Sequence, residues 1–317
     1  MTATRVRFLV ILSALIALPL TGCQKKQGKT VGFAQEGDEN AWRMAETKSV
    51  QAEAAKRAIN LSFANAQGDL QKQINAVRSF IAQRVDAIIL APKVETGWEP
   101  VLKEAKDAKI PVVLIDRGVS ADPDLYATLI ESDFVEEGRR VGEWLAGHTS
   151  GDVNIVELEG TAGSAPANDR KKGFDGEIAK HPNMHILASQ DGNFTREKGK
   201  EVMTNFLLTI GKDKINAVYA HNDDMALGAI QAIEAAGKKP GKDIMVVSID
   251  GIHDGLQAIL DGKINCICEC NPLLGPDAFD AVEALLHGKT LEKKMVEKDQ
   301  LFDHEHLTKE MLADRKY

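Results

Sequence analysis

The sequence predicts an α/β fold made of two similar lobes, each built on a sheet of mainly parallel strands. Apolar runs of four to six residues alternate with longer stretches in which apolar residues recur at helical spacing. This alternation indicates βαβ units, which form parallel sheets covered by helices on both faces. The chain has 317 residues, enough for two separate cores.

The expected elements follow one another with recognisable starts and stops. Stretches such as "AWRMAETKSVQAEAAKRA" and "QKQINAVRSFIAQR" have the apolar spacing of helices. Asp133 with Glu136 fits a capping box at a helix start, and Gly237 fits a helix stop. The apolar runs expected as strands are "TVGFA" at 30, "LSFA" at 61, "AIILA" at 87, "PVVLI" at 111, "VNIVEL" at 153, "HILAS" at 185, "NAVYA" at 216 and "IMVVSI" at 244.

The boundary between the lobes is expected near Ser132. The first set of runs ends near Leu129 and the second begins near Val153, with no long Gly/Ser-rich or Pro-rich linker between them. Lobes joined without such a linker usually share short crossover strands, and a hinge of that kind lets them close on a ligand.

Residues 1–22 have the layout of a secretory signal. Arg5 and Arg7 precede the apolar run "FLVILSALIALPL", which is too short for a comfortable membrane span. The run ends in "LTGC", Leu20 to Cys23, which resembles the bacterial lipobox, whose cysteine becomes the lipid-modified first residue of the mature protein. We expect export to the periplasm or cell envelope and a lipid anchor on Cys23; a plain signal peptide cut elsewhere is the alternative.

Charge and motifs narrow the class of ligand. A net charge of −8 and a pI near 5.6 argue against nucleic acid, which requires a basic excess on one face. The chain has neither GxGxxG nor GxxxxGK[ST], the Gly-rich patterns that bind phosphate groups. No cofactor and no metal ion are expected.

Three cysteines remain beside Cys23, in the run "NCICEC": Cys266, Cys268 and Cys270. Spacing of two along a strand puts them on one face with parallel side chains, which is poor geometry for a disulfide. We expect small buried side chains, and a redox or metal role is the alternative.

Polar side chains follow several of the expected strands directly. Asp116 and Arg117 come after "PVVLI", Asn222 comes after "NAVYAH", and Asp250 comes after "IMVVSI". In a doubly wound fold these positions lie at one edge of each sheet, so two facing lobes would bring them into one cleft.

Two further segments add to this set. "QEGDENAWR" places Glu39, Asn40, Trp42 and Arg43 at the entrance to a helix, and Arg170 begins the helix after "VNIVELEG". Carboxylates, an amide and guanidinium groups together satisfy hydroxyls that both donate and accept, while an indole covers the C–H face of a sugar ring. Each residue also has a structural explanation as a helix cap, a core anchor, a solvated base or an internal ion pair.

With these residues in view, the chain resembles the periplasmic sugar-binding proteins of ribose and galactose ABC importers, and most closely their galactofuranose-binding members. The resemblance covers essentially the whole mature length. It is carried by "LIDRG", "GTAGSAPANDRKKGF", "NFTREKGKEVM", "YAHNDDMALGAIQAI", "SIDGIHDGLQAILDGKI" and "TGWEPVLKEAKDA".

The resemblance implies two Rossmann-like lobes joined by three crossover strands, the type I architecture of such proteins. The N-terminal lobe would comprise residues 29–132 and 271–297, and the C-terminal lobe residues 133–270 and 298–317. Phe194 would be a second stacking ring. The implied ligand contacts are Glu39, Asn40, Trp42, Arg43, Asp116, Arg117, Arg170, Phe194, Asn222 and Asp250.

Three positions depart from related patterns. Ala91 stands where ribose binders carry an Asn, which argues against ribose and agrees with the galactofuranose type. Cys270 stands where ribose binders carry a Gln, so that contact is absent. Asn40 stands where the galactofuranose type has a smaller hydroxyl residue.

The predicted function is therefore a sugar receptor, not an enzyme. The receptor, a monomer, would close over a monosaccharide, galactofuranose or a related sugar. It would then deliver the sugar to a permease with a cytoplasmic ATPase. The alternative is a sensor that presents its sugar to a membrane kinase or chemoreceptor. A hydrolytic site built from Asp223, Asp224 and Asp250 is disfavoured, because neighbouring acids at a helix start do not both face a ligand.

Overall fold

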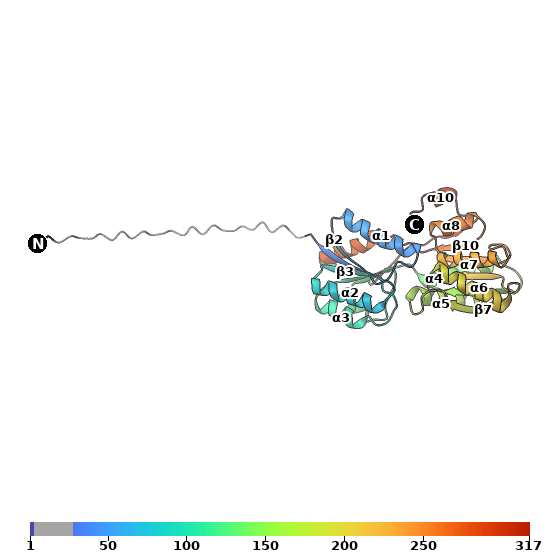
Figure 1. Ribbon diagram of the computed structural model, residues 1–317, viewed down its shortest axis with the longest axis horizontal. Helices are drawn as coiled ribbons and strands as arrows, with labels where there is room; N and C mark the ends of the chain where they lie inside the picture. Colours follow the sequence, from blue (N-terminus) through green and yellow to red (C-terminus); the bar gives the residue numbers. More distant parts are fainter. Residues whose placement is uncertain (3–27) are drawn as a thin grey trace.

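The computed structural model describes residues 1–2 and 28–317, and it contains two α/β lobes that lie side by side (Figure 1). The expected signal peptide over residues 1–22 and the expected anchor at Cys23 lie outside the described residues. Within residues 1–2 and 28–317, no helix is both long enough and apolar enough to cross a membrane.

Each lobe is built on a six-stranded sheet. The first sheet is parallel throughout, and the second is parallel except for one edge pair, β12 with β10. The strand order of the first is β11 (Lys294–Val296), β5 (Thr128–Glu131), β4 (Val112–Ile115), β3 (Ala87–Leu90), β1 (Thr30–Gln35) and β2 (Asn60–Asn65). The strand order of the second is β12 (Leu301–Asp303), β10 (Cys266–Glu269), β9 (Met245–Asp250), β8 (Ala217–Ala220), β6 (Val153–Glu159) and β7 (Met184–Asp191).

Helices cover both faces of each sheet, so each lobe has two apolar clusters. The first lobe carries α1 (Ala41–Lys56), α2 (Leu70–Gln83), α3 (Glu99–Asp107), a 3-10 turn η1 (Pro123–Leu125) and α9 (Gly275–Leu286). The second carries α4 (Phe134–Gly147), α5 (Ala165–Ile178), α6 (Arg196–Phe206), which runs on into the π turn η2 (Leu207–Gly211), then α7 (Asp223–Ala235), α8 (His253–Leu260) and α10 (Lys309–Ala313). The predicted α/β class with two parallel-rich sheets is confirmed.

The chain passes between the lobes three times, as expected. It leaves the first sheet after β5, returns to it between β10 and β11, and leaves it again between β11 and β12. Trp42, on α1 of the first lobe, packs into an apolar cluster of the second lobe together with Cys268 and Cys270. The two lobes are therefore in contact beside the crossing segments.

The local signals in the sequence are confirmed with two departures. The Glu136 carboxylate pairs with Arg139 instead of closing the capping box, and Arg170 lies in the second turn of α5 and not at its start. All eight predicted strands form. Asp133 caps α4 by accepting a hydrogen bond from Glu136 N at 3.1 Å. Gly237 follows α7 with a φ of +75°, which suits glycine. The cap of α7 is Asn222, which accepts from Met225 N at 3.0 Å, and not Asp223 or Asp224.

The thiols of Cys266, Cys268 and Cys270 are free and buried. The first two lie on β10 and the third follows it, and all three pack in one apolar cluster of the second lobe. Burial raises the pKa of each thiol above its ordinary value. The prediction of small buried side chains on a strand is confirmed for Cys266 and Cys268.

Candidate functional site

A small pocket lies between the two lobes, with about 260 Å³ of space outside the protein atoms, which includes open solvent. It is formed at the carboxyl ends of the central strands, where open α/β sheets gather ligands. All of the predicted contact residues except Glu39 border it, together with Pro166. Its lining is Asn40, Trp42, Arg43, Asp116, Arg117, Pro166, Arg170, Phe194, Asn222 and Asp250.

On the first lobe, the start of α1 sets the position of three lining residues. Asn40 has extended backbone and caps the helix, since its side-chain oxygen accepts from Arg43 N at 2.8 Å. Trp42 and Arg43 therefore fall in the first helical turn and are buried. The Trp42 indole donates to the carbonyl of Cys270 on the other lobe at 2.6 Å.

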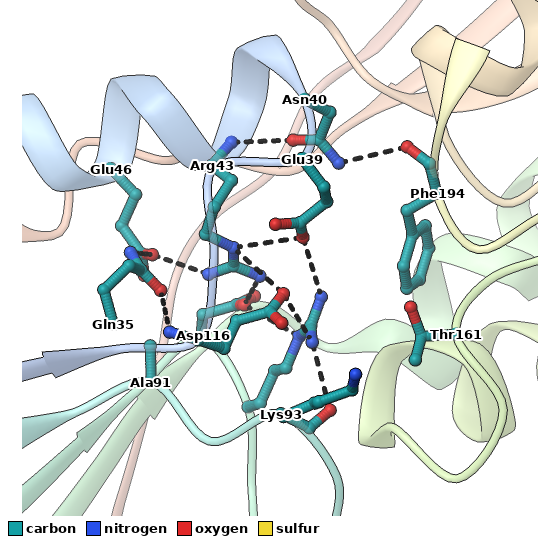
Figure 2. Close-up of polar contacts among 12 residues, drawn as sticks. Gln35, Glu39, Asn40, Arg43, Glu46, Ala91, Lys93, Asp116, Thr161 and Phe194 are labelled. Carbon is teal, nitrogen blue, oxygen red and sulfur yellow. Dashed lines mark hydrogen bonds and ion pairs between the residues drawn. The ribbon is translucent and has the colours of Figure 1, made fainter. Parts of the chain in front are cut away.

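Arg43 is held by carboxylates on two sides (Figure 2). Its guanidinium lies 2.6 Å from Glu46 and 2.6 Å from Asp116, and the amide of Gln35 donates to the same Glu46 oxygen at 2.8 Å. Burial opposes the charge of Arg43, yet the surrounding carboxylates hold its pKa well above the ordinary value. The pKa of Glu46 is raised to about 6, chiefly by burial. The guanidinium is thus fixed in orientation before any ligand arrives.

Arg117 is held in the same manner by the loop after β1. It lies 2.9 Å from Glu36 and 3.7 Å from Glu39, and it donates to the carbonyl of Lys93 at 3.1 Å. Burial raises the pKa of Glu36 to about 8, so this carboxyl carries a proton at neutral pH. Burial also acts on Glu39, but the hydrogen bond with Glu36 and the guanidinium groups of Arg43 and Arg117 lower its pKa to about 2. Glu39 lies beside the pocket and pairs with the arginines that border it.

On the second lobe, Arg170 borders the pocket, as Arg43 and Arg117 do on the first lobe. It donates to Glu137 and to the carbonyl of His221, both at 2.7 Å, and lies 3.7 Å from Asp250. Burial raises the pKa of Glu137 to about 7 and moves that of Asp250 well above its ordinary value, against the opposing effect of Arg170. The neighbouring Asp223 is also buried, and it adds to the rise at Asp250.

The two strand-end acids share an unusual backbone. Asp116 has a φ of +61° and Asp250 a φ of +127°, in a region that residues other than glycine seldom adopt. Such positions cost about 1–3 kcal/mol each and cluster at functional sites. Both lobes therefore turn an acid into the pocket at the end of a central strand.

Phe194 links the lobes. Its carbonyl accepts from the side-chain amides of Asn40 on the first lobe and Asn222 on the second, each at 3.2 Å. The centre of its ring lies 5.5 Å from the guanidinium of Arg117 and 5.9 Å from that of Arg170. The ring packs on Gly160, where a Cβ would lie 1.9 Å from a ring atom.

Of the three acids considered for hydrolysis, Asp250 borders the pocket and the other two do not. Asp223 accepts hydrogen bonds from Ser248 and from the backbone of Gly251 and Ile252, so it holds the turn that carries Asp250. Asp224 accepts from Ala41 N at 3.2 Å across the lobes and pairs with Arg196. Neither borders the pocket.

Sequence reasoning missed Pro166 in the lining and the carboxylates that hold the arginines, Glu36, Glu46 and Glu137. The run "FAQE" that ends in Glu36 was a usable signal, because an acid directly after a buried strand lies at the same edge as Asp116. Glu46 and Glu137 gave no such signal, since each lies within a helix.

The positions that set this chain apart from ribose binders are both buried. Ala91 has no polar side chain, and its carbonyl accepts from Gln73 at 2.7 Å. The carbonyl of Cys270 is engaged by Trp42, and its thiol is buried in the cluster described above.

The pocket can bind a small neutral molecule rich in hydroxyls. Three guanidinium groups supply donors, and acids already lie beside them: Asp116 by Arg43, Glu39 by Arg117 and Glu137 by Arg170, so the lining as a whole does not favour an anion. Phe194 and Trp42 supply apolar area. Among the described residues, no cluster of His, Cys, Asp and Glu has the arrangement of a metal site.

Comparison with known proteins yields consistent similarities. The family model of the periplasmic binding protein domain matches residues 31–290. The galactofuranose-binding protein of Escherichia coli (strain K12) is 52% identical over 269 residues, which cover 84% of this chain and 85% of that protein.

Two solved structures have the same fold. The arabinose ABC transporter binding protein of Shewanella sp. ANA-3, bound to α- and β-L-arabinofuranose, superposes with a TM-score of 0.85 and 53% identity, covering 87% of this chain and 92% of that one. A protein of Mycobacterium smegmatis in complex with β-D-fucofuranose superposes with a TM-score of 0.85 and 52% identity, covering 88% and 92%.

Proposed function

The chain belongs to the periplasmic binding protein family, and from that premise we propose that it is the solute receptor of an ABC sugar importer. It closes its two lobes over one monosaccharide in the five-membered furanose form and presents it to the permease. Galactofuranose or a close relative such as arabinofuranose is the proposed ligand, and the residues bordering the pocket are the proposed contacts.

The observation that carries this proposal is the opposition of charged and amide groups across one small pocket. Asp116 and Arg117 approach from the first lobe, while Arg170, Asn222 and Asp250 approach from the second. A ligand that contacts residues of both lobes stabilises the closed state. A ligand that contacts a single lobe would not shift the equilibrium between the open and closed states. Hydroxyl groups suit this set because each of them both donates and accepts.

The ligands named for similar proteins support a furanose. Galactofuranose, arabinofuranose and fucofuranose are named for three similar proteins, and all three are five-membered rings.

The proposal also includes the oligomeric state, the lipid anchor and the lobe boundaries that the sequence predicts. The receptor is a monomer anchored through a lipid on Cys23 after removal of residues 1–22. Its lobes comprise residues 29–132 with 271–297 and residues 133–270 with 298–317. The anchor predicts a mature protein that partitions into detergent, and Cys23→Ala should abolish both this partitioning and the mass added by the lipid.

Mass spectrometry of the native protein, released from its ligand by denaturation, tests the proposed function. We expect a co-purified pentose or hexose. In parallel, calorimetry is done with L-arabinose, D-galactose and D-fucose, and with D-ribose as a matched non-ligand. With 13C-labelled L-arabinose, the bound anomeric carbon should give the chemical shift of the furanose ring. No binding of the first three sugars, or a bound pyranose, would overturn the proposal.

A further inference from the structure

The loops at the rim of the cleft touch each other directly, outside the pocket. Glu95, in the loop after β3, donates its backbone N–H to the carbonyl of Gly163 at 2.9 Å. The Glu95 carboxylate accepts a hydrogen bond from the side-chain amide of Asn168 on α5. Neither Glu95 nor Asn168 borders the pocket. These bonds join the first lobe to the second, so they exist only when the lobes are closed.

The Glu95 loop is firmly attached to the first lobe. The carbonyl of Glu95 accepts from Ser120 N at 2.7 Å, and the carbonyl of Val94 accepts from the indole of Trp98 at 2.7 Å. The Trp98 side chain is buried. The loop therefore moves together with the first lobe, and a contact made by the loop at the rim restrains the whole lobe.

The same loop is attached to a residue of the pocket. Arg117 donates to the carbonyl of Lys93, two residues before Glu95. On the opposite side, Asn168 lies two residues before Arg170 on α5. Each half of the rim contact is thus connected by a short rigid segment to an arginine that borders the pocket.

We propose that Glu95 and Asn168 form a rim latch, which holds the lobes closed and sets the affinity for sugar without touching it. The inference rests on the proposed function. The latch stabilises only the closed state, and the apparent dissociation constant is inversely proportional to the population of the binding-competent state. Its loss therefore raises Kd by the same factor for every sugar and raises the dissociation rate.

Single substitutions test the latch by calorimetry and stopped-flow measurements with L-arabinose and D-galactose. Glu95→Ala and Asn168→Ala should each raise Kd about 2–10-fold, the range for one net hydrogen bond. The ratio of the two Kd values should stay that of the wild type. The double variant should lose no more than the larger single variant, because the two side chains act as one contact. Glu99→Ala, an exposed carboxylate four residues after Glu95, is the matched control and should bind as the wild type does.

An exchange of partners separates the contact from general damage. Asn168→Asp places two carboxylates together and should weaken binding further, while Glu95→Gln combined with Asn168→Asp restores an amide–carboxylate pair and should recover affinity. Wild-type Kd in the single variants, additive losses, or failure of the exchange to recover affinity would overturn the latch. Failure of the wild type itself to bind either sugar would instead count against the proposed function, and the latch would fall with it.

Discussion

Arg117 and Arg170 belong to different lobes, yet their guanidinium groups lie 5.5 Å and 5.9 Å from the centre of the same ring, that of Phe194. Each guanidinium has a carboxylate beside it: Arg117 lies 3.7 Å from Glu39, whose lowered pKa keeps it ionised, and Arg170 donates to Glu137 at 2.7 Å. Two like charges can therefore approach one aromatic ring without strong repulsion. Closure of the lobes creates this arrangement, and a ligand in the pocket would lie against it.

Phe194→Leu should weaken sugar binding about tenfold, since a cation–π contact contributes about 0.5–2 kcal/mol and the ring also lines the pocket. The matched control is Phe206→Leu. Phe206 packs in the same apolar cluster and is similarly buried, but it does not border the pocket. Both variants should lose about 1 kcal/mol of stability in urea unfolding, and only Phe194→Leu should lose affinity in calorimetry. Equal sugar affinities of the two variants would show that the Phe194 ring contributes only to packing in the core.

Asp250→Asn should reduce the affinity for L-arabinose about 2–10-fold, because the amide cannot replace both oxygens of the carboxyl group and one net hydrogen bond contributes about 0.5–1.5 kcal/mol. The substitution keeps the shape of the side chain, so the ligand-free protein should still fold. The sugar-dependent rise in Tm measures the effect. Asp254→Asn, at an exposed carboxylate paired with Arg196 outside the pocket, serves as the control and should respond as the wild type. A sugar-dependent rise in Tm equal to that of the wild type in Asp250→Asn would show that Asp250 does not bind the sugar.

Glu36→Gln should change how stability depends on pH. Below about pH 4.5, Glu36 is protonated in both the folded and the unfolded chain. Between pH 4.5 and about 8, the unfolded chain releases the proton while the folded chain keeps it, so the wild type loses stability as pH rises. The variant lacks this loss, and its Tm relative to the wild type should increase from pH 5 to pH 8.

Glu39→Gln provides the comparison for that experiment. The pKa of Glu39 is lowered to about 2, so its own contribution to stability is complete above pH 4.5 and is lost only as pH falls toward 2. Glu39 also helps to raise the pKa of Glu36, so the Tm of Glu39→Gln relative to the wild type should rise between pH 5 and pH 8, but less than that of Glu36→Gln. A constant Tm difference for Glu36→Gln would contradict the raised pKa of Glu36.

Gly138→Ala should destabilise the second lobe by about 1–3 kcal/mol, the usual cost of overpacking. A Cβ at Gly138 would lie 2.1 Å from the backbone oxygen of Arg170, so α4 and α5 would have to separate. Sugar affinity should fall with stability, because α5 carries Arg170 into the pocket. Urea unfolding and calorimetry measure the two effects.

Gly176→Ala, on the neighbouring helix α5, provides the comparison. A Cβ there has no atom within 4 Å, so the substitution should stabilise the protein by about 0.5–1 kcal/mol through helix propensity and leave affinity unchanged. Similar stability changes at Gly138 and Gly176 would show that the helices are not in tight contact.

Much of the fold could be read from short segments. The strand "PVVLI" and the cap Asp133 depend on residues within a few positions of each other, and the structure has both. The pocket lining also followed from local order, because Asp116 and Asp250 directly follow central strands and parallel strands end at one edge. Short edge strands such as Lys294–Val296 lack an apolar run, so no local sequence pattern predicted them.

Chain order and local chemistry were enough to predict two sheets and the polar residues at their strand ends, because strand periodicity, helix capping and the direction of parallel strands are short-range properties. The three crossings and the place of Phe194 were implied by the resemblance to a known family. Tertiary packing alone determined which carboxylate neutralises which guanidinium, as in Arg170 with Glu137, 33 residues apart, and Arg43 with Asp116, 73 residues apart. It also determined that Glu95 meets Asn168 at the rim. Such pairings depend on how closely two lobes approach and how much water they exclude, and neither quantity is set by neighbouring residues in the chain.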